Sequence, residues 1–203
     1  MWQHKLSTYQ LNHQSDANLI VMCHADHLTI GLRDRPELGM VHTTFDDPSH
    51  QHRLRTLHLG PNPLAKACGS PTKYLTILDA TAGWGEDSFV LYHLGHQVFS
   101  VEQHPLLACI LADNIDKHCL QYPRKNTWQS QWGHHLDFLK GQRGPWDVIY
   151  FDMMFPPKAY QAKSQKKMAF LQALMPIEAL ELPSWQLAKQ QSQRIVIKHA
   201  ANR

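Results

Sequence analysis

The sequence predicts an α/β fold, a parallel sheet with helices on both faces, preceded by a small β-rich extension. From Tyr74 onward, short runs of β-forming residues alternate with helical runs, the pattern of successive βαβ units. The chain has 203 residues, 43% of them hydrophobic, so it can bury a substantial core in one domain with a small appendage. The predicted strands of the sheet are Leu75–Asp79, Gln97–Glu102, Thr127–Gln131, Val148–Asp152 and Arg194–Lys198. The predicted helices are Asp87–Leu94, Pro105–Cys119, Leu136–Lys140, Lys163–Leu174 and Pro183–Gln191.

Three apolar runs predict the N-terminal extension. Leu19–Cys23 and His27–Gly31 flank a short polar turn, and Val41–Phe45 follows a loop that Pro and Gly residues interrupt. These runs predict a small β-meander. The stretch 46–59 that follows is polar and rich in histidine, and it predicts no element.

The junction between the extension and the sheet domain is predicted from a short helical segment. Pro63–Cys68 has helical character, and residues 69–71, Gly-Ser-Pro, end it. We therefore predict a β-rich extension and linker over residues 1–66. Residues 67–203 are predicted to form a Rossmann-like domain.

The charge pattern is compatible with a polyanionic partner. The formal net charge is +3 and the pI is near 8.7. Two basic clusters can face the phosphates of an RNA, and a solvated surface is the alternative interpretation of each. The candidate RNA-binding residues are Arg53, Arg55, Lys158, Lys166 and Lys167. No signal-peptide pattern and no stretch of about 20 apolar residues occurs, so we expect a soluble, cytoplasmic protein.

We expect no metal site and no disulfide. The four cysteines, Cys23, Cys68, Cys109 and Cys119, contain no C-x-x-C pair. The 15 histidines are scattered, without a second ligand cluster at structural spacing. Reduced, buried thiols are therefore favoured over metal ligands or disulfides.

A glycine-rich turn follows the first predicted strand of the sheet, in the segment Asp79-Ala-Thr-Ala-Gly-Trp-Gly85. Gly83 and Gly85 can adopt backbone conformations closed to other residues and let the chain approach a ligand. An apolar strand that ends in an acid and leads through such a turn to a helix is typical of a nucleotide-type site. Ser88 replaces the third glycine of the dinucleotide fingerprint, which disfavours pyrophosphate. S-adenosylmethionine carries no phosphate, and an acid-flanked turn can make room for its amino-acid arm.

The next two strands end in further candidate ligand contacts. Glu102 stands where an acid accepts hydrogen bonds from both ribose hydroxyls in Rossmann-like sheets, and a helix cap or surface acid before Pro105 is the alternative. His134 and His135 lie in the loop where related folds place polar residues against adenine. An exposed loop histidine is an equally open interpretation of either one.

The segment from Asp147 to Pro157 is the most informative part of the sequence. It reads as a strand that delivers Asp152 to the carboxyl edge of the sheet and then breaks at two prolines. The arrangement resembles the Asp-Pro-Pro-Tyr type motif of methyltransferases that modify exocyclic amines, in which an acid and a backbone carbonyl accept from the NH₂ and an aromatic residue stacks on the base. Asp152 is thus the candidate catalytic residue that orients the amine, and Phe155 would hold the ring plane. In the alternative interpretation, Asp152 caps a helix and Phe155 is part of the hydrophobic core.

Together these residues resemble the ribosomal RNA small subunit methyltransferase J family, from about Leu19 to Ala200. The most specific pieces are the Asp79–Gly85 turn, Asp87-x-Phe89-Val-Leu91, Glu102-x-x-Pro105, Asp152-x-Met-Phe-Pro156 and Ile195-Val-Ile-Lys198. The resemblance implies a class I S-adenosylmethionine-dependent methyltransferase that modifies a guanine N2 in 16S ribosomal RNA. It implies ribosomal RNA or the small ribosomal subunit as the partner.

The resemblance also implies a set of site residues. The cofactor-binding residues would be Asp79, Gly83, Gly85, Glu86, Asp87, Glu102, Gln103, His134, His135 and Asp152. Met153 replaces a proline of the family motif, and the segment His52–Pro63 has fewer glycines than its counterpart. These departures keep open a catalytically impaired homologue that acts as an RNA-binding or ribosome-assembly protein. A methyltransferase of adenine N6 or of protein glutamine is compatible with the Asp152 motif taken alone.

Overall fold

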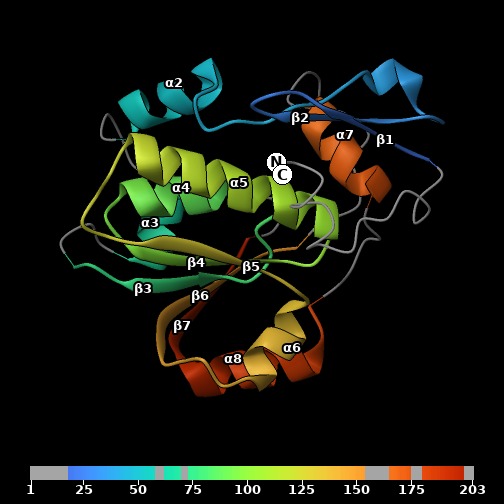
Figure 1. The fold of residues 1–203 in the computed structure, drawn as a ribbon. Coiled ribbons are helices and arrows are strands. Elements are labelled where there is room, and N and C mark those ends of the chain that lie inside the picture. The colour runs from blue at the N-terminus through green and yellow to red at the C-terminus, as the bar shows by residue number, and fades with distance from the viewer. Residues whose placement is uncertain (1–17, 58–61, 70–72, 154–164, 175–179, 199–203) are drawn as a thin grey trace.

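The computed structural model describes residues 18–57, 62–69, 73–153, 165–174 and 180–198 (Figure 1). Its strands are β1 Leu19–Cys23, β2 Leu28–Leu32, β3 Thr76–Asp79, β4 Gln97–Glu102, β5 Trp128–Trp132, β6 Trp146–Asp152 and β7 Ser192–Lys198. Its helices are α2 Pro48–Thr56, α3 Pro63–Cys68, α4 Glu86–His93, α5 Pro105–Gln121, α6 His135–Lys140, α7 Gln165–Leu174 and α8 Leu182–Gln191, with a short 3-10 helix η1 Pro36–Leu38. Within these ranges, no helix combines the length and apolar character that a membrane crossing requires.

The strands β3 to β7 form one parallel sheet in the order β5-β4-β3-β6-β7. The chain builds outward from β3 through β4 to β5 and then returns to place β6 on the other side of β3. The carboxyl ends of β3 and β6 thus form the switch point at which α/β sheets bind ligands. The predicted α/β fold is confirmed, and each predicted strand and helix of the sheet domain lies within two residues of its expected bounds.

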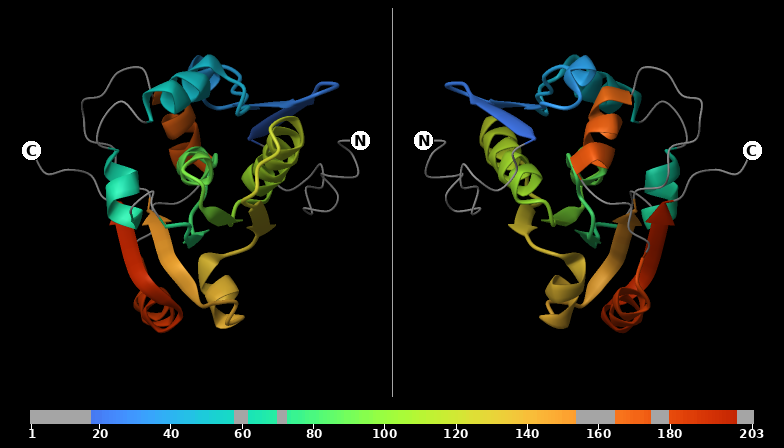
Figure 2. Two further views of the ribbon diagram at one scale, coloured as in Figure 1. Left: turned by 90° about the vertical axis from the view of Figure 1, so that its left-hand side faces the viewer. Right: turned by 90° about the vertical axis from the view of Figure 1, so that its right-hand side faces the viewer.

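Alternating strand side chains pack against a helical layer on each face of the sheet. Ile77 and Val148 point to the face covered by α3, α4 and α5, whereas Leu78 and Ile149 point to the face covered by α6 and α8 (Figures 1 and 2). Because both faces are buried, the central strands are apolar at successive positions rather than at alternate ones. The sheet therefore forms the middle layer of a three-layer domain.

The ends of α3 and α5 follow from local capping. The side-chain oxygen of Asn62 accepts a hydrogen bond from the backbone N–H of Ala65 at 3.1 Å and caps α3, which Gly69 ends. Pro105 occupies the first turn of α5, where its missing N–H would have no intrahelical partner and its fixed φ suits a helix. These local signals explain why both helices begin where the sequence predicts them.

The N-terminal extension begins with a hairpin in which β1 and β2 pair antiparallel. The predicted third strand over Val41–Phe45 is wrong, because only Val41 pairs, through an isolated antiparallel bridge to Ile30. The pairing stops there because the chain then leaves the hairpin for the sheet domain, where Phe45 is buried.

Helix α2 lies in the polar stretch 46–59, for which the sequence predicts no element. Pro48 occupies its first turn, and His50 is its buried side chain. Because most of this helix is polar, it lacks the apolar stripe that makes a surface helix recognisable from periodicity.

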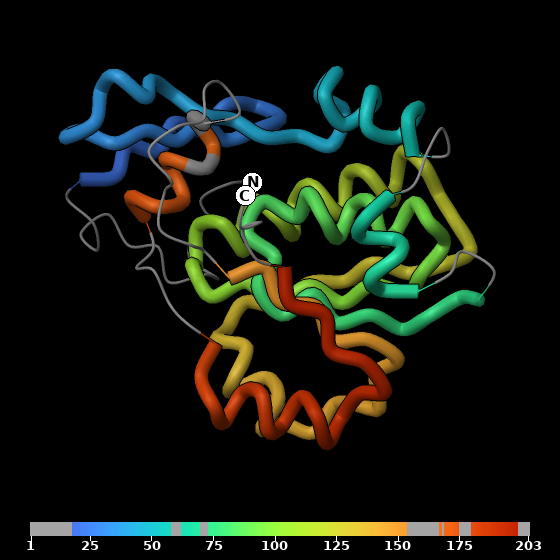
Figure 3. Tube along the Cα trace, turned by 180° about the vertical axis from the view of Figure 1, so that it is seen from behind, coloured from blue at the N-terminus to red at the C-terminus, as the bar shows by residue number. Residues whose placement is uncertain are grey.

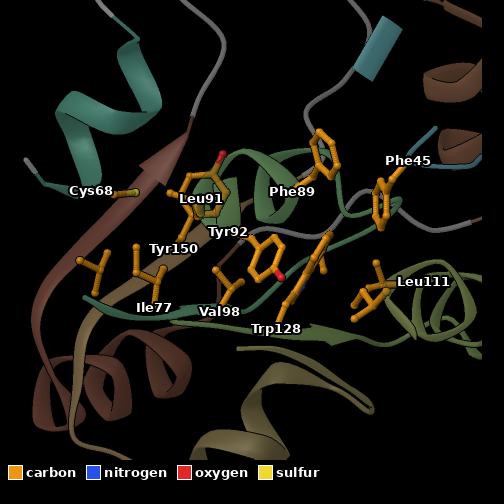
Figure 4. Close-up of a cluster of buried hydrophobic side chains, with 13 residues drawn as sticks. Phe45, Cys68, Ile77, Phe89, Leu91, Tyr92, Val98, Leu111, Trp128 and Tyr150 are labelled. Carbon is orange, nitrogen blue, oxygen red and sulfur yellow. The ribbon is translucent and has the colours of Figure 1, made fainter. Parts of the chain in front are cut away.

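Phe45 joins the extension to the core of the sheet domain. Its side chain is 2% exposed, and its ring centroid lies 4.9 Å from that of Phe89 in α4 and 4.8 Å from that of Trp128 in β5. Figure 4 shows it entering this cluster beside Leu111 of α5. The extension and the sheet domain therefore share a hydrophobic core, and the boundary between residues 66 and 67 stays a prediction.

The hairpin packs on α5 and α7. Leu28 and Ile30 share a hydrophobic cluster with Leu107 of α5 and Phe170 of α7. Figure 3 shows α7, in orange, beside the blue hairpin. Trp84 of the glycine-rich turn joins the same cluster, with its ring centroid 6.2 Å from that of Phe170. The extension and α7 thus lie close to the turn that precedes α4.

Phe45→Ala tests the shared core. We expect it to lower the free energy of unfolding by about 3–5 kcal/mol, because it removes a buried ring and leaves a cavity between Phe89 and Trp128. Tyr74→Ala is the matched control, since Tyr74 is 79% exposed, and we expect a change within about 0.5 kcal/mol. Chemical denaturation measures both values. Similar losses in the two variants would show that Phe45 does not join the extension to the core.

Candidate functional site

The glycine-rich turn between β3 and α4 is the centre of the candidate site. Gly83 has a φ of 54° and Gly85 a φ of 78°, conformations that side-chain-bearing residues rarely adopt. A Cβ at Gly85 would lie 2.4 Å from Cδ1 of Leu111, whereas one at Gly83 would meet only Cδ1 of Leu171, at 3.9 Å. Gly85 therefore lets the start of α4 pack against α5. Gly83 leaves space beside the turn, where a ligand can approach the backbone.

Glu102, at the end of β4, holds the turn in place. Its side chain is 3% exposed, and its two carboxylate oxygens accept the backbone N–H groups of Gly83 and His104, each at 2.7 Å. Burial raises the pKa of Glu102 to about 7, although both backbone hydrogen bonds favour the ionised form. The structure thus places the predicted ribose-binding acid directly beneath the turn, and its contact with ribose stays a prediction.

Asp79, at the end of β3, receives a chain of side-chain hydrogen bonds. Its Oδ2 accepts the hydroxyl of Ser88 at 2.6 Å, Ser88 Oγ lies 2.7 Å from Ser100 Oγ, and the indole N–H of Trp128 donates to Ser100 at 2.9 Å. Because Ser88 donates its one proton to Asp79, Ser100 must donate to Ser88, so the chain ends at the carboxylate. Burial raises the pKa of Asp79 to about 7. Asp79 therefore anchors α4 and β4 below the turn, and its cofactor contact stays a prediction.

Asp152 ends β6 beside Lys198, which ends β7. The ammonium nitrogen of Lys198 lies 2.6 Å from Oδ2 of Asp152 and 2.9 Å from Oδ2 of Asp87 in the first turn of α4. The backbone N–H of Asp152 donates to Thr81 Oγ1 at 2.7 Å, which ties the end of β6 to the glycine-rich turn. The hydroxyl of Tyr150 donates to Asp87 at 2.7 Å. The candidate catalytic acid Asp152 is thus joined to the glycine-rich turn by a direct hydrogen bond.

Asp87 and Asp152 differ in how strongly the site favours their ionised forms. Burial acts to raise the pKa of Asp87, but the charge of Lys198 and hydrogen bonds from Lys198, Tyr150 and Arg53 outweigh it and lower the pKa to about 2. At Asp152 burial is the larger effect, so the pKa is raised even though Lys198 acts to lower it. Asp87 is therefore firmly ionised, whereas the charge on Asp152 depends more on its surroundings.

Two of the predicted RNA-binding cations contact the first turn of α4. Arg53 of α2 lies 2.7 Å from Oδ1 of Asp87 and donates to the backbone carbonyl of Glu86 at 3.1 Å. Lys167 of α7 lies 3.6 Å from Oε1 of Glu86 and 3.8 Å from Oδ2 of Asp47. These ion pairs bring the predicted cofactor-binding acids Glu86 and Asp87 together with α2 and α7. The roles of all four side chains toward ligands stay predictions.

Three residues predicted to bind the cofactor follow β4 and β5: Gln103, and the two histidines predicted to contact adenine, His134 and His135. His134 is the N-cap of α6, and its Nδ1 accepts a backbone N–H of the first turn at 3.2 Å. His135 is buried edge-on against Phe151, with ring centroids 5.7 Å apart. The backbone carbonyl of Gln103 accepts the indole N–H of Trp132 at 3.1 Å. Both histidine side chains thus have structural roles, and adenine binding stays a prediction.

The other predicted site residues lie in different parts of the chain. Phe155, Lys158 and the side chain of Lys166 lie outside the described residues. Arg55 is exposed on α2. Met153 is buried in the cluster on the α6 and α8 face of the sheet, so its side chain serves the core.

Lys198 and Thr81 belong to the site although the sequence analysis assigned them no role. Lys198 was detectable, since it ends an apolar strand just as Asp152 does, and the ends of parallel strands meet at one edge. Its register partner in the sheet is Asp152. Thr81 carried no signal beyond its place in the turn, because its contact with the end of β6 depends on the tertiary fold.

The sequence matches known proteins over nearly its whole length. A family model described as "Putative SAM-dependent methyltransferase" matches residues 4–202. Ribosomal RNA small subunit methyltransferase J of Photorhabdus laumondii is 33% identical over 198 residues, which cover 93% of this chain and 78% of that protein. The chain belongs to the ribosomal RNA small subunit methyltransferase J family. Family members of the same name from Haemophilus influenzae and Shewanella amazonensis are 32% and 30% identical over 200 residues, 94% of this chain and 76% and 79% of theirs.

A solved structure agrees with the fold of this family member. The crystal structure of a SAM-dependent methyltransferase from Neisseria gonorrhoeae superposes with a TM-score of 0.67. The two proteins are 24% identical, and the match covers 96% of this chain and 79% of that chain. The likeness confirms the predicted class I methyltransferase fold.

Membership of the methyltransferase J family makes this protein an S-adenosylmethionine-dependent enzyme, and the described residues fit that cofactor. The turn has space at Gly83, lies at the switch point of the sheet, and is surrounded by Asp79, Glu102 and Asp152. Acids at the strand ends suit a ligand with hydroxyl and amino groups and disfavour one with phosphates. In the described part of the chain, no three His, Cys, Asp or Glu side chains are grouped so as to hold a metal ion.

The two glycines of the turn predict different effects of substitution. We expect Gly85→Ala to lower the free energy of unfolding by about 2–5 kcal/mol, because left-handed strain adds to overlap with Leu111. Gly83→Ala should lower the free energy of unfolding by about 1–2 kcal/mol, since only the left-handed backbone strain applies there and no side chain overlaps the new methyl group. Chemical denaturation compares them. A loss at Gly83 as large as that at Gly85 would contradict the distinction.

The raised pKa of Glu102 predicts pH-dependent cofactor binding. We expect the affinity for S-adenosylmethionine to increase as the pH rises through about 7, because the ionised carboxylate can accept ribose hydroxyls as well as its two backbone donors. Calorimetric titrations at several pH values measure this.

Two variants assign that pH dependence to one acid. Glu102→Gln should remove it, whereas Asp79→Asn should keep it, although the pKa of Asp79 is also raised to about 7. If only Asp79→Asn loses the pH dependence of cofactor affinity, the dependence belongs to Asp79, and the prediction for Glu102 is contradicted.

Proposed function

We propose that this protein transfers a methyl group from S-adenosylmethionine to the exocyclic N2 amine of a guanosine in 16S ribosomal RNA. The observation that carries the proposal is the position of Asp152 at the end of β6, joined through Thr81 to the glycine-rich turn at the switch point of the sheet. An acid at that position can meet an amine held next to a cofactor on the turn. Relatives that are 30–33% identical bear the name ribosomal RNA small subunit methyltransferase J, which supports the choice of RNA.

The chemistry requires the amine to be oriented more than it requires a strong base. The lone pair of an aryl amine is delocalised into the ring and must be turned toward the methyl group for in-line displacement. S-adenosylmethionine, when bound, supplies a methyl group activated by its sulfonium. Asp152 accepts a hydrogen bond from the amine and stabilises the positive charge that grows on nitrogen. The new C–N bond would form as the C–S bond breaks, with S-adenosylhomocysteine as the leaving group, and the methylated nitrogen would then release its acidic proton to water.

The backbone around Asp152 favours this role. Its N–H group is held by Thr81 and its Oδ2 by Lys198, while Oδ1 makes no hydrogen bond to any described residue. Oδ1 is therefore the oxygen that we assign to the amine. Phe155, which the sequence places three residues later, is the candidate for stacking on the base.

The partner that we propose is ribosomal RNA, free or within the small ribosomal subunit, and the place of action is then the cytoplasm. Exposed Arg55 on α2 and the predicted cations Lys158 and Lys166 are the candidates for contact with phosphates. No finding supports the alternative of a catalytically impaired assembly protein.

Two measurements test the proposed function. A calorimetric titration with S-adenosylmethionine should show binding, and its absence at millimolar ligand would overturn the catalytic proposal. Incubation of the purified protein with labelled cofactor and either 16S RNA or isolated small subunits should produce N2-methylguanosine, located by mass spectrometry of RNA fragments. Label in another nucleotide would keep the enzyme and replace the substrate assignment.

Asp152→Asn tests the catalytic residue. We expect kcat to fall by a factor of about 100 or more, because the neutral amide stabilises the growing positive charge less well. Affinity for S-adenosylmethionine should stay within about tenfold, since Asp152 acts mainly in the transition state. Steady-state kinetics and calorimetry separate the two effects. Near wild-type kcat in this variant would exclude Asp152 from the reaction.

A further inference from the structure

Lys198 is the cation that contacts the candidate catalytic acid at the carboxyl edge of the sheet. It ends β7, and its strand register places it beside Asp152, the last residue of β6. Its ammonium group bridges Asp152 and Asp87, at 2.6 Å and 2.9 Å, so it touches both the candidate catalytic acid and the first turn of α4. Lys198 therefore connects the carboxyl ends of β6 and β7 with α4, the helix that follows the glycine-rich turn.

The charges at this edge make such a bridge necessary. The carboxylates lie close together: Asp87 acts to raise the pKa of both Asp79 and Asp152, and Asp152 acts to raise that of Asp79. Lys198 lies between two of them, and Arg53 contacts Asp87 from the other side. Removing the ammonium group would leave Asp152 facing like charges with no described cation in contact.

The contacts of Asp152 fix the direction of its carboxylate. Its backbone N–H is held by Thr81 and its Oδ2 by Lys198, so rotation about the side-chain bonds would break the ion pair. Oδ1 then points to a single place relative to the glycine-rich turn. In-line displacement tolerates little misplacement, because an error of about 1 Å can cost about 100-fold in rate.

We propose that Lys198 is a positioning residue for methyl transfer, which holds Oδ2 of Asp152 and braces it against Asp87 so that Oδ1 receives the target amine. This inference rests on the proposed function, since it takes Asp152 as the group that orients the amine. Lys198 does not itself need to touch the amine or the cofactor.

Lys198 also favours the ionised form of Asp152. Burial raises the pKa of Asp152, and the nearby carboxylate of Asp87 acts in the same direction, while Lys198 acts to lower it. Asp152 in turn acts on Asp79 and Tyr150: burial raises the pKa of both groups, the charge of Asp152 raises it further, and both therefore stay neutral more readily. Loss of the lysine should therefore shift the protonation of Asp152 to higher pH.

A merely structural role would have different consequences. The side chain of Lys198 is 52% exposed, so shortening it leaves no buried cavity. Exposed ion pairs contribute little to stability. A positioning role predicts a loss in kcat and a shifted pH profile with the fold and the cofactor affinity nearly unchanged.

Three variants test the inference in the full chain. Lys198→Met removes the charge and keeps most of the length of the side chain, Lys198→Arg keeps the charge, and Lys189→Met is the control. Lys189 is exposed on α8, which covers the face of the sheet opposite to α4 (Figure 1). It makes no ion pair with a described residue. The measurements are kcat and KM for 16S RNA across pH, calorimetric affinity for S-adenosylmethionine, and the melting temperature.

We expect Lys198→Met to lower kcat at least about tenfold near neutral pH and to move the acidic limb of the kcat profile to higher pH. Cofactor affinity should change by less than about threefold. Lys198→Arg should recover most of kcat and the wild-type acidic limb, and Lys189→Met should match wild type. If Lys198→Met does not fold, Lys198→Gln carries the same comparison, because it keeps a hydrogen-bond donor without the charge.

The outcomes separate this inference from the proposed function. Wild-type protein that binds no cofactor or methylates no RNA overturns the proposed function and the inference with it. Active wild-type protein with kcat within twofold in Lys198→Met, and an unmoved acidic limb, overturns the inference alone. A fall in cofactor affinity as large as the fall in kcat also overturns it, because Lys198 would then be a binding residue.

Discussion

The parallel pairing of β3, β4, β6 and β7 is the constraint on which the rest of the site depends. Strands that run the same way deliver their last residues to one edge, and here those residues are Asp79, Glu102, Asp152 and Lys198. Three acids at one edge would be unfavourable without compensation. Ser88 and backbone N–H groups satisfy the two buried acids, and Lys198 pairs with the third. The sheet thus both concentrates the charge and supplies the means to accommodate it.

Burial divides the acids of the site into two kinds. Asp79 and Glu102 lie under the glycine-rich turn, where loss of solvent raises each pKa to about 7. Asp87 meets two cations and a phenol, which lower its pKa to about 2. The turn therefore rests on acids whose pKa values lie near neutrality, while the first turn of α4 carries an ionised carboxylate that is paired with two cations. A cofactor with amino and hydroxyl groups can use both kinds of acceptor.

The N-terminal extension is part of this construction. Phe45 completes the cluster formed by Phe89 and Trp128, and Arg53 reaches Asp87, which Lys198 contacts from the other end of the chain. Contacts between segments distant in sequence thus converge on the first turn of α4. Cations that the sequence suggests as RNA-binding residues, such as Arg53, form ion pairs with acids of the protein itself.

The sequence by itself determined the α/β class, the strands and helices of the sheet domain, and the acids at the strand ends. These follow from apolar runs, glycines and capping residues, whose effects act over a few neighbours. The sequence did not predict α2, because a mostly polar helix has no apolar stripe from which its periodicity can be recognised. It also predicted a third strand over Val41–Phe45, where Val41 makes only one isolated bridge. Only the tertiary structure decided that Glu102 supports the turn, that His134 caps a helix, and that Lys198 bridges Asp87 and Asp152. The contacts of Glu102 with Gly83 and of Lys198 with Asp87 and Asp152 join residues far apart in the chain, and packing and charge across the folded sheet select them. The His134 cap is local, but its sequence context fits a ligand contact as well as a cap, and only the folded loop distinguishes the two.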